Sequence, residues 1–81
     1  MAYTALDANQ IGGTLKGLRE KRGETMEELS NAINVSPSAI AMYESGRRIP
    51  RDEIKIKIAE HFSRTVESIF YQKKQHDSCS A

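Results

Sequence analysis

The chain has 81 residues, which is enough for one small domain and too few for a second hydrophobic core. Its 12 Lys and Arg residues and 11 Asp and Glu residues leave a formal net charge of +1, so the chain as a whole is neither a basic nucleic-acid coat nor an acidic tail. It has no apolar run long enough for a transmembrane span, and Met1–Gln10 lacks the pattern of a secretory signal. The single cysteine, Cys79, excludes an intrachain disulfide, and with two distant histidines it supplies no metal-ligand set. We therefore expect a cytoplasmic protein without a metal or cofactor.

The N-terminal part of the chain divides into an irregular start and a first helix. Residues 1–10 show no periodicity, and we expect them to form a flexible arm. Apolar residues recur at helical spacing from Ile11 to Leu18, and Gly23 is placed to end the helix. Three glycines inside the helix weaken it by roughly 1 kcal/mol each relative to alanine, so its start is expected to fray. These are Gly12, Gly13 and Gly17.

The next two helices are short and have clear start signals. Thr25 and Glu28 have the spacing of a capping box. The chain must turn at Asn34, and asparagine suits this position because it tolerates a left-handed backbone. Ser36 and Pro37 provide an N-cap and a proline at the first helical position, so they open a third helix of about two and a half turns. The buried stripe of the second helix is predicted to be Met26, Leu29, Ala32 and Ile33.

Residues 52–62 can be interpreted as a strand or as a helix. The isoleucines in Ile54–Ile58 alternate with lysines at the period of a strand. The acidic start and the recurrence of Ile54, Ile58 and Phe62 at i, i+4 and i+8 favour a helix. We predict a helix, because the sequence offers no second strand-like run to pair with this one.

The chain is predicted to close with a short helix and a polar tail. Thr65 can cap a helix that continues to about Tyr71. Residues 72–81 are polar and have no pattern, so we expect a disordered tail. The predicted fold class is therefore all-α, with a single five-helix domain over residues 11–71.

The second and third helices have a helix-turn-helix pattern in which each position has a steric reason. Five apolar side chains must point into the angle between the helices. Ser30 must be small because the other helix crosses close over it, and Asn34 must make the turn. A generic pair of helices rarely meets all of these constraints in register. The five apolar residues are Leu29, Ile33, Val35, Ile40 and Tyr43.

On these residues the sequence resembles the Cro/phage-repressor (XRE) helix-turn-helix family. The resemblance extends from about Ile11 to Tyr71 and is carried by Leu18–Gly23, Thr25–Val35 and Ser36–Gly46. It implies a compact five-helix, lambda-repressor-like domain of bacterial or phage type. It also implies a dimer that binds a near-palindromic operator and represses, or sometimes activates, transcription.

The resemblance further implies an ion pair between the first helix and the end of the third, here Arg19 with Glu44. Chemically the pair is reasonable, because a guanidinium can bind a carboxylate with two hydrogen bonds and still offer a donor to DNA phosphate. The alternative is that both side chains are solvated. The sequence departs from the family at Met26, where Gln is usual, at Asn34, where Gly is usual, and at Ser63-Arg64, where Gly-Val is preferred.

The outward side chains of the third helix are the candidates for reading bases in the major groove. They include no Arg, Asn or Gln, so we expect specificity to come from thymine methyl groups, one or two serine hydrogen bonds and DNA shape. The alternative is that they form the solvent side of a surface helix. The candidates are Ser36, Pro37, Ser38, Ala41 and Met42.

Phosphate contacts are expected from the basic loop after the third helix and from helix starts. Lys16 and Arg22 can support from the first helix, and backbone amides that open the second and third helices can add uncharged contacts. The alternative is a solvated basic loop. The candidate residues are Arg19, Thr25, Met26, Ser45, Arg47, Arg48 and Arg51.

Ile56 and Tyr71 fall off the predicted core stripe and are candidates for a dimer surface, whereas His61 is interpreted as a surface residue. The sequence thus predicts a homodimeric regulator that binds double-stranded operator DNA, most simply a repressor, with no catalytic residues and no small-molecule ligand. The alternative from another class is a protein-interaction module of the same fold, such as an antirepressor or an antitoxin-type partner. Met26 and the weakly polar outward face favour this alternative, and the basic loop disfavours it.

Overall fold

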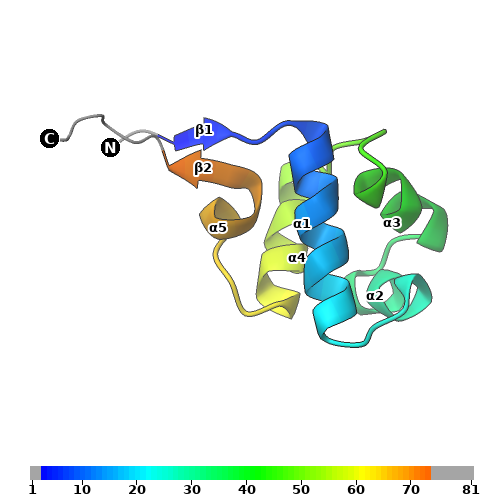
Figure 1. Cartoon of the computed structure of the whole chain (residues 1–81). Coiled ribbons are helices and arrows are strands. Elements are labelled where there is room, and N and C mark those ends of the chain that lie inside the picture. The colour runs from blue at the N-terminus through cyan, green and yellow to red at the C-terminus, as the bar shows by residue number, and fades with distance from the viewer. Residues whose placement is uncertain (1–2, 74–81) are drawn as a thin grey trace, which may run out of the picture.

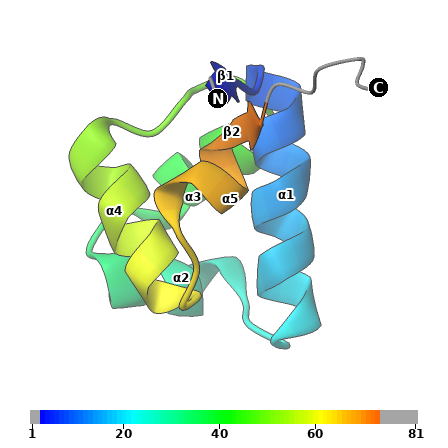
Figure 2. The ribbon, with the colours of Figure 1, turned by 90° about the vertical axis from the view of Figure 1, so that its left-hand side faces the viewer.

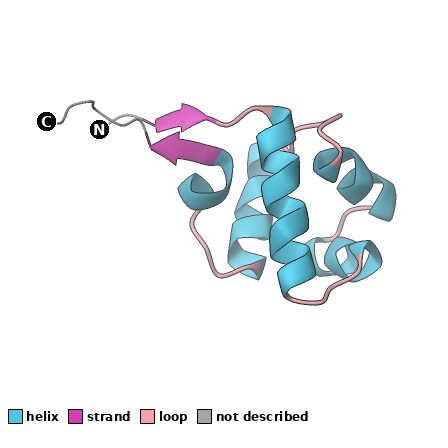
Figure 3. Cartoon of the chain, in the orientation of Figure 1, coloured by secondary structure: helices cyan, strands magenta, loops and turns pink. Residues whose placement is uncertain are grey.

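A computed structural model of the chain describes residues 3–73. It contains five α-helices and a two-stranded sheet made by the two ends of the described chain (Figures 1 and 3). The five-helix, all-α fold class is therefore confirmed. None of the described helices is long and apolar enough to cross a membrane. The elements in chain order are β1 (Tyr3–Ala5), α1 (Ala8–Lys21), α2 (Met26–Ile33), α3 (Pro37–Glu44), α4 (Asp52–His61), α5 (Val66–Phe70) and β2 (Tyr71–Lys73).

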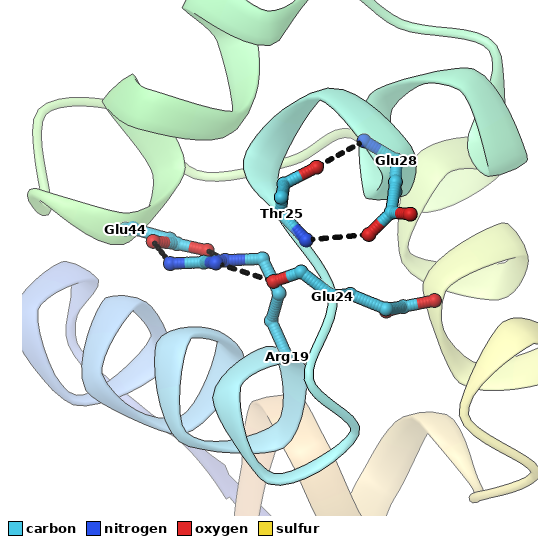
Figure 4. Close-up of polar contacts among 5 residues, drawn as sticks. All are labelled: Arg19, Glu24, Thr25, Glu28 and Glu44. Atoms are coloured by element: carbon cyan, nitrogen blue, oxygen red, sulfur yellow. Dashed lines mark hydrogen bonds and ion pairs between the residues drawn. The ribbon is translucent and has the colours of Figure 1, made fainter.

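The predicted helix starts are present at α2, α3 and α5. The Thr25 hydroxyl accepts a hydrogen bond from the Glu28 amide at 3.0 Å, and the Glu28 carboxylate accepts one from the Thr25 amide at 2.9 Å (Figure 4). Ser36 caps α3 ahead of Pro37, and Thr65 caps α5. Each cap supplies a partner that a first-turn amide lacks within the helix, and this fixes where the helix begins.

The alternating isoleucines form a helix, as predicted. In α4, Ile58 is fully buried and Ile54 is half-buried, whereas Ile56 is 51% exposed. A strand would place all three side chains on one face, because successive strand residues point to opposite sides. Asp52 and Glu53 lie in the first turn, where their negative charge complements the helix dipole.

The prediction of a flexible arm is wrong for residues 3–10. Asp7 and Gln10 form a capping box that starts α1 three residues earlier than predicted. The Asp7 carboxylate accepts a hydrogen bond from the Gln10 amide at 2.8 Å, and the Asp7 amide donates to the Gln10 side chain at 3.0 Å. Ahead of this cap, β1 pairs antiparallel with β2, and the Leu6 amide extends the pairing by donating to the Phe70 carbonyl at 3.0 Å.

The prediction of a disordered tail is wrong for residues 72–73, which belong to β2. The strand follows α5 directly, so the last helix ends at Phe70 rather than near Tyr71. Pairing with β1 gives the backbone of this segment hydrogen-bond partners. The polar sequence of the segment does not predict this pairing. Residues 74–81, which include His76 and Cys79, lie outside the described residues.

The core lies between α1 and α4, which stand on two sides of it. Figure 2 shows α5 between these two helices, on the side away from α2 and α3. In α2 the predicted buried stripe is confirmed at Leu29 and Ile33 and is wrong at Ala32, which is exposed beside the groove between α2 and α4. The buried hydrophobic residues are Ile11, Leu15, Leu29, Ile33, Ile40, Tyr43, Ile58, Ala59, Phe62, Ile69 and Phe70.

Gly12 has a packing role that its helix propensity does not reveal. It is buried where α1 meets the C-terminal end of α3. A Cβ atom at this position would lie 2.7 Å from the carbonyl oxygen of Tyr43 and in still closer contact with that of Glu44. A side chain would therefore push the two helices apart. At Gly13 the same atom would meet open space.

Candidate nucleic-acid interface

The turn between α2 and α3 has the geometry that the sequence predicts. Asn34 adopts a left-handed conformation with φ 60° and ψ 49°. The Val35 amide donates to the carbonyl of Ser30 at 2.9 Å, and Ser30 itself is fully buried. The Ser30 hydroxyl donates to the Glu27 carbonyl at 2.7 Å, so its polar group is satisfied inside the helix pair. These contacts hold α3 across α2 in a fixed orientation.

The outer face of α3 is free, because its core contacts come from the other side of the helix. Ile40 and Tyr43 are 1% and 5% exposed and pack inward. All five residues that the sequence proposes for base contact are exposed on this helix or at its N-cap, and Met42 is 40% exposed. These residues are Ser36, Pro37, Ser38, Ala41 and Met42. Their contact with bases stays a prediction.

Arg19 and Glu44 form a buried ion pair between α1 and the last residue of α3. The Arg19 Nε donates to Glu44 Oε2 at 2.7 Å, and Nη2 donates to Oε1 at 3.1 Å (Figure 4). Their side chains are 10% and 4% exposed. The hydrogen bonds that Arg19 donates to Glu44 raise the pKa of its guanidinium against the opposing effect of burial. This is the pair that the family resemblance implies, and it fixes the C-terminal end of α3 to α1.

Arg19 of α1 and Arg22 at its C-cap both make contacts with other parts of the protein. Arg19 also donates from Nη1 to the Glu24 carbonyl at 2.7 Å, so three of its five N–H groups are used. Arg22 donates to the His61 carbonyl at 2.7 Å and lies 5.5 Å from the centre of the Phe62 ring. Both arginines therefore help to position the elements that they contact, and their predicted support of phosphate binding stays a prediction.

Sequence reasoning missed a contact between Glu24 and His61. The Glu24 Oε2 and the His61 Nε2 are 2.7 Å apart, and the two side chains are 16% and 18% exposed. The interpretation of His61 as a surface residue is therefore wrong. No sequence signal could have found this contact, because the residues are 37 positions apart and both types are common on surfaces. The contact ties the loop after α1 to the end of α4.

At the start of α2, fewer groups are available to donate hydrogen bonds to phosphate than the sequence predicts. The Thr25 side chain and amide are both used in the capping box with Glu28. The side chain of Met26 is half-buried against the core. The amides of Met26 and Glu27 remain as first-turn donors without a helical partner. At the start of α3, Pro37 has no N–H group and Ser36 binds the Ala39 amide, which leaves the Ser38 amide as the corresponding donor.

The basic loop after α3 is exposed and anchored at both ends. Gly46 turns the chain with φ +80°, and the amides of Arg47 and Arg48 donate to the Met42 carbonyl at 2.9 and 3.3 Å. Pro50 is buried at the other end of the loop, whereas Ile49 is 49% exposed. The exposed polar residues of this segment are Ser45, Arg47, Arg48 and Arg51, all of which were predicted to contact phosphates.

The two residues predicted for a dimer surface lie in one groove of about 410 Å³. Ile56 comes from α4, and Tyr71 comes from the start of β2. The ammonium group of Lys55 lies 5.2 Å from the centre of the Tyr71 ring and 3.8 Å from the Asp52 carboxylate. Val66 and Glu67 complete the groove. The role of this groove in dimerisation stays a prediction.

A fixed pair of helices, a free outer face on the second helix and an adjoining loop of three arginines define a helix-turn-helix domain of the DNA-binding transcriptional-regulator type. The chain belongs to the helix-turn-helix family HTH_3, whose family profile matches residues 15–69. The resemblance seen in the sequence is therefore confirmed.

Known proteins share this domain as part of chains of different length. Endothelial differentiation-related factor 1 of Homo sapiens is 39% identical over 49 residues, which cover 60% of this chain and 33% of that protein. The chain thus spans about a third of the length of this curated relative. The crystal structure of the clp gene regulator ClgR from C. glutamicum is 26% identical with a TM-score of 0.70, and the match covers 79% of this chain and 83% of that one. PlcR of Bacillus thuringiensis, solved with the peptide PapR7 and DNA, is 29% identical with a TM-score of 0.71, over 76% of this chain and 22% of that one.

Proposed function

We propose that two copies of this chain bind a near-palindromic operator in double-stranded DNA and act as a repressor. The observation that carries the proposal is the free outer face of α3, which the Arg19–Glu44 pair and the Asn34 turn hold in one orientation. Phosphate-binding groups flank this face on both sides, with amides at the start of α2 and arginines in the loop after α3. The DNA in the PlcR structure supports the same use of the fold.

The chemistry of the outer face favours apolar readout of the major groove. Pro37, Ala41 and Met42 offer carbon surface that suits the methyl group of thymine. Ser36 uses its side-chain oxygen as a helix cap, so Ser38 is the hydroxyl best placed to hydrogen-bond a base. We therefore expect an operator in which thymines face Ala41 and Met42, with further specificity from DNA shape.

The dimer surface is proposed to be the groove between α4, α5 and β2. Ile56 is a large apolar side chain, 51% exposed, at the edge of this groove. A two-fold contact places the same patch against itself, so Lys55 of one copy can face Glu67 of the other. To read two half-sites one turn of B-DNA apart, the recognition helices of the two copies must lie about 34 Å from each other.

The experiment is a selection of bound duplexes from a random-sequence pool, followed by affinity measurements on the enriched sequence. Ala41→Glu places a negative charge on the outer face of α3 and should abolish binding, because it faces the phosphate-rich groove. Ala32→Glu is the matched control, since Ala32 is an exposed helical alanine beside α4 residues. Equal affinities of the Ala41→Glu and wild-type proteins would contradict the proposal.

A protein-interaction module is the second candidate, and one observation favours it. Met42 and Ile49 are 40% and 49% exposed in the same part of the molecule, which is the kind of apolar surface that protein partners cover. The same selection decides between the candidates. A pool from which no duplex is enriched would favour the protein-interaction function.

A further inference from the structure

Ile49 is a large apolar side chain that neither the core nor the proposed base contacts use. It is 49% exposed between Arg48 and the buried Pro50. We propose that Ile49 is an apolar wedge, which the loop 47–51 inserts into the DNA minor groove beside the major groove that α3 occupies. The inference rests on the proposed DNA-binding function and adds a second contact with a different chemistry.

The position of the loop supports this contact. The amides of Arg47 and Arg48 both donate to the carbonyl of Met42, so the start of the loop is held directly against the C-terminal end of α3. When α3 lies in the major groove, a loop held at its end lies close to a sugar-phosphate strand, and the minor groove lies on the other side of that strand. The loop passes from α3 to α4 at the outer edge of the molecule (Figure 1).

The loop also has the rigidity that a wedge requires. Gly46 fixes the turn at its start, and Pro50 is buried at its end. Arg51 has N-cap geometry and begins α4 directly afterwards. Little conformational entropy therefore remains to be lost when Ile49 enters a groove, because the backbone on both sides is already held.

The charges around Ile49 favour DNA over a second copy of the chain. Residues 45–51 contain three arginines and no acidic residue. Two such loops in contact would bring six guanidinium groups together without neutralisation, whereas the walls of a minor groove are lined by phosphates. The nearest acid in the chain is Asp52, and its carboxylate lies 3.8 Å from the Lys55 ammonium. Apolar wedges flanked by basic residues are a known means of unstacking a base step and kinking DNA.

The test uses full-length protein and a duplex obtained by selection from a random-sequence pool, with 2-aminopurine placed at successive steps beside each half-site. Wild-type protein should raise the fluorescence of the probe at one step per half-site, because unstacking relieves its quenching. Ile49→Ala should abolish this rise at saturating protein and weaken binding roughly tenfold, which corresponds to about 1.4 kcal/mol. Ile49→Met keeps apolar length and should retain the rise.

Lys57→Ala is the matched control, because Lys57 is a long, exposed side chain of α4 that belongs to neither the proposed DNA contacts nor the groove assigned to the dimer. It should leave the fluorescence rise unchanged at saturation. Thermal unfolding followed by circular dichroism should show that Ile49→Ala is folded at the temperature of the assay, with only a small loss of stability, since the side chain is half-exposed. An unchanged rise in Ile49→Ala would overturn the wedge alone. A shift of the monomer–dimer equilibrium of free Ile49→Ala, measured by ultracentrifugation, would assign Ile49 to a protein contact and would also overturn it. Failure to enrich any duplex would overturn the DNA-binding function, and the wedge with it.

Discussion

Removal of Glu44 should destabilise the domain more than removal of both members of its ion pair. Glu44→Leu leaves the guanidinium of Arg19 buried at 8% exposure, with only the Glu24 carbonyl as a partner among its observed contacts. Leaving a buried charge without its partner costs about 3–5 kcal/mol. A domain of this size has a total stability of roughly 4–12 kcal/mol, so the variant should lose a large share of it.

The assay is urea unfolding followed by far-ultraviolet circular dichroism, since the chain has no tryptophan. The double variant Arg19→Met/Glu44→Leu replaces the pair by apolar side chains and should recover at least about 1.4 kcal/mol relative to Glu44→Leu. Asp52→Asn is the control, because that carboxylate is 94% exposed and lies 3.8 Å from Lys55. It should lower the unfolding free energy by no more than about 1 kcal/mol, because it removes only an exposed ion pair and a first-turn helix charge. A double variant as unstable as Glu44→Leu would refute the reasoning.

The same pair predicts how its contribution depends on pH. Glu44 raises the pKa of the Arg19 guanidinium. A raised pKa gives stability that is fully present below the pKa of the unfolded chain and is lost only as the pH rises through the folded value. An arginine titrates far above neutrality, so the difference in unfolding free energy between wild type and Arg19→Met/Glu44→Leu, which leaves neither charge unpaired, should stay constant from about pH 6 to about pH 9. If the reasoning is wrong, urea titrations at pH values near both ends of this range would show that the difference in unfolding free energy declines as the pH rises.

Three further predictions concern packing, the turn and the DNA contact. Gly12→Ala should destabilise the domain by about 1–3 kcal/mol, because its Cβ would press on the carbonyl of Tyr43. Gly13→Ala, whose Cβ meets open space, should instead stabilise the domain by up to about 1 kcal/mol. Equal effects of the two variants in urea unfolding would contradict this. Asn34→Ala should cost about 1–2 kcal/mol because alanine disfavours the left-handed conformation, and Asn34→Gly should not, which thermal unfolding can compare. Arg48→Ala should lower the slope of log affinity against log salt by about 1 for each bound copy, and an unchanged slope would remove Arg48 from the phosphate contacts.

Local chemistry made most of the fold predictable from the sequence. The capping box at Thr25 and Glu28, the left-handed Asn34 and the Ser36-Pro37 start each depend on residues close together in the chain. The fourth helix was predictable against its strand-like alternation, because Ile54, Ile58 and Phe62 define a helical stripe. The start of α1 was missed although Asp7 and Gln10 carry the same capping-box spacing that was recognised at α2.

Contacts between residues distant in sequence were not predictable from the residues themselves, and the Arg19–Glu44 pair was expected only through the family resemblance. β1 and β2 are three residues each and pair across the whole domain, so neither has a periodic signal of its own. Gly12 looked like a weak position because its role depends on a backbone carbonyl 31 residues later, at Tyr43. In the candidate site, the exposed residues of α3 followed from helical periodicity. The hydrogen bond from Arg22 to the end of α4 did not, because the sequence does not distinguish an exposed arginine that contacts a distant helix from one that is only solvated.

The pairing of β1 with β2 determines where anything attached to this domain must emerge. The register sets Tyr3 opposite Lys73, so the incoming and outgoing chain cross the surface side by side. This point lies at the far end of the molecule from α2 and α3 (Figure 1). A fusion partner, tag or additional domain joined to either strand is therefore attached at the end of the molecule away from the helix pair α2–α3. The arrangement makes the fold a module that can be inserted into larger proteins without obstructing its outer helix.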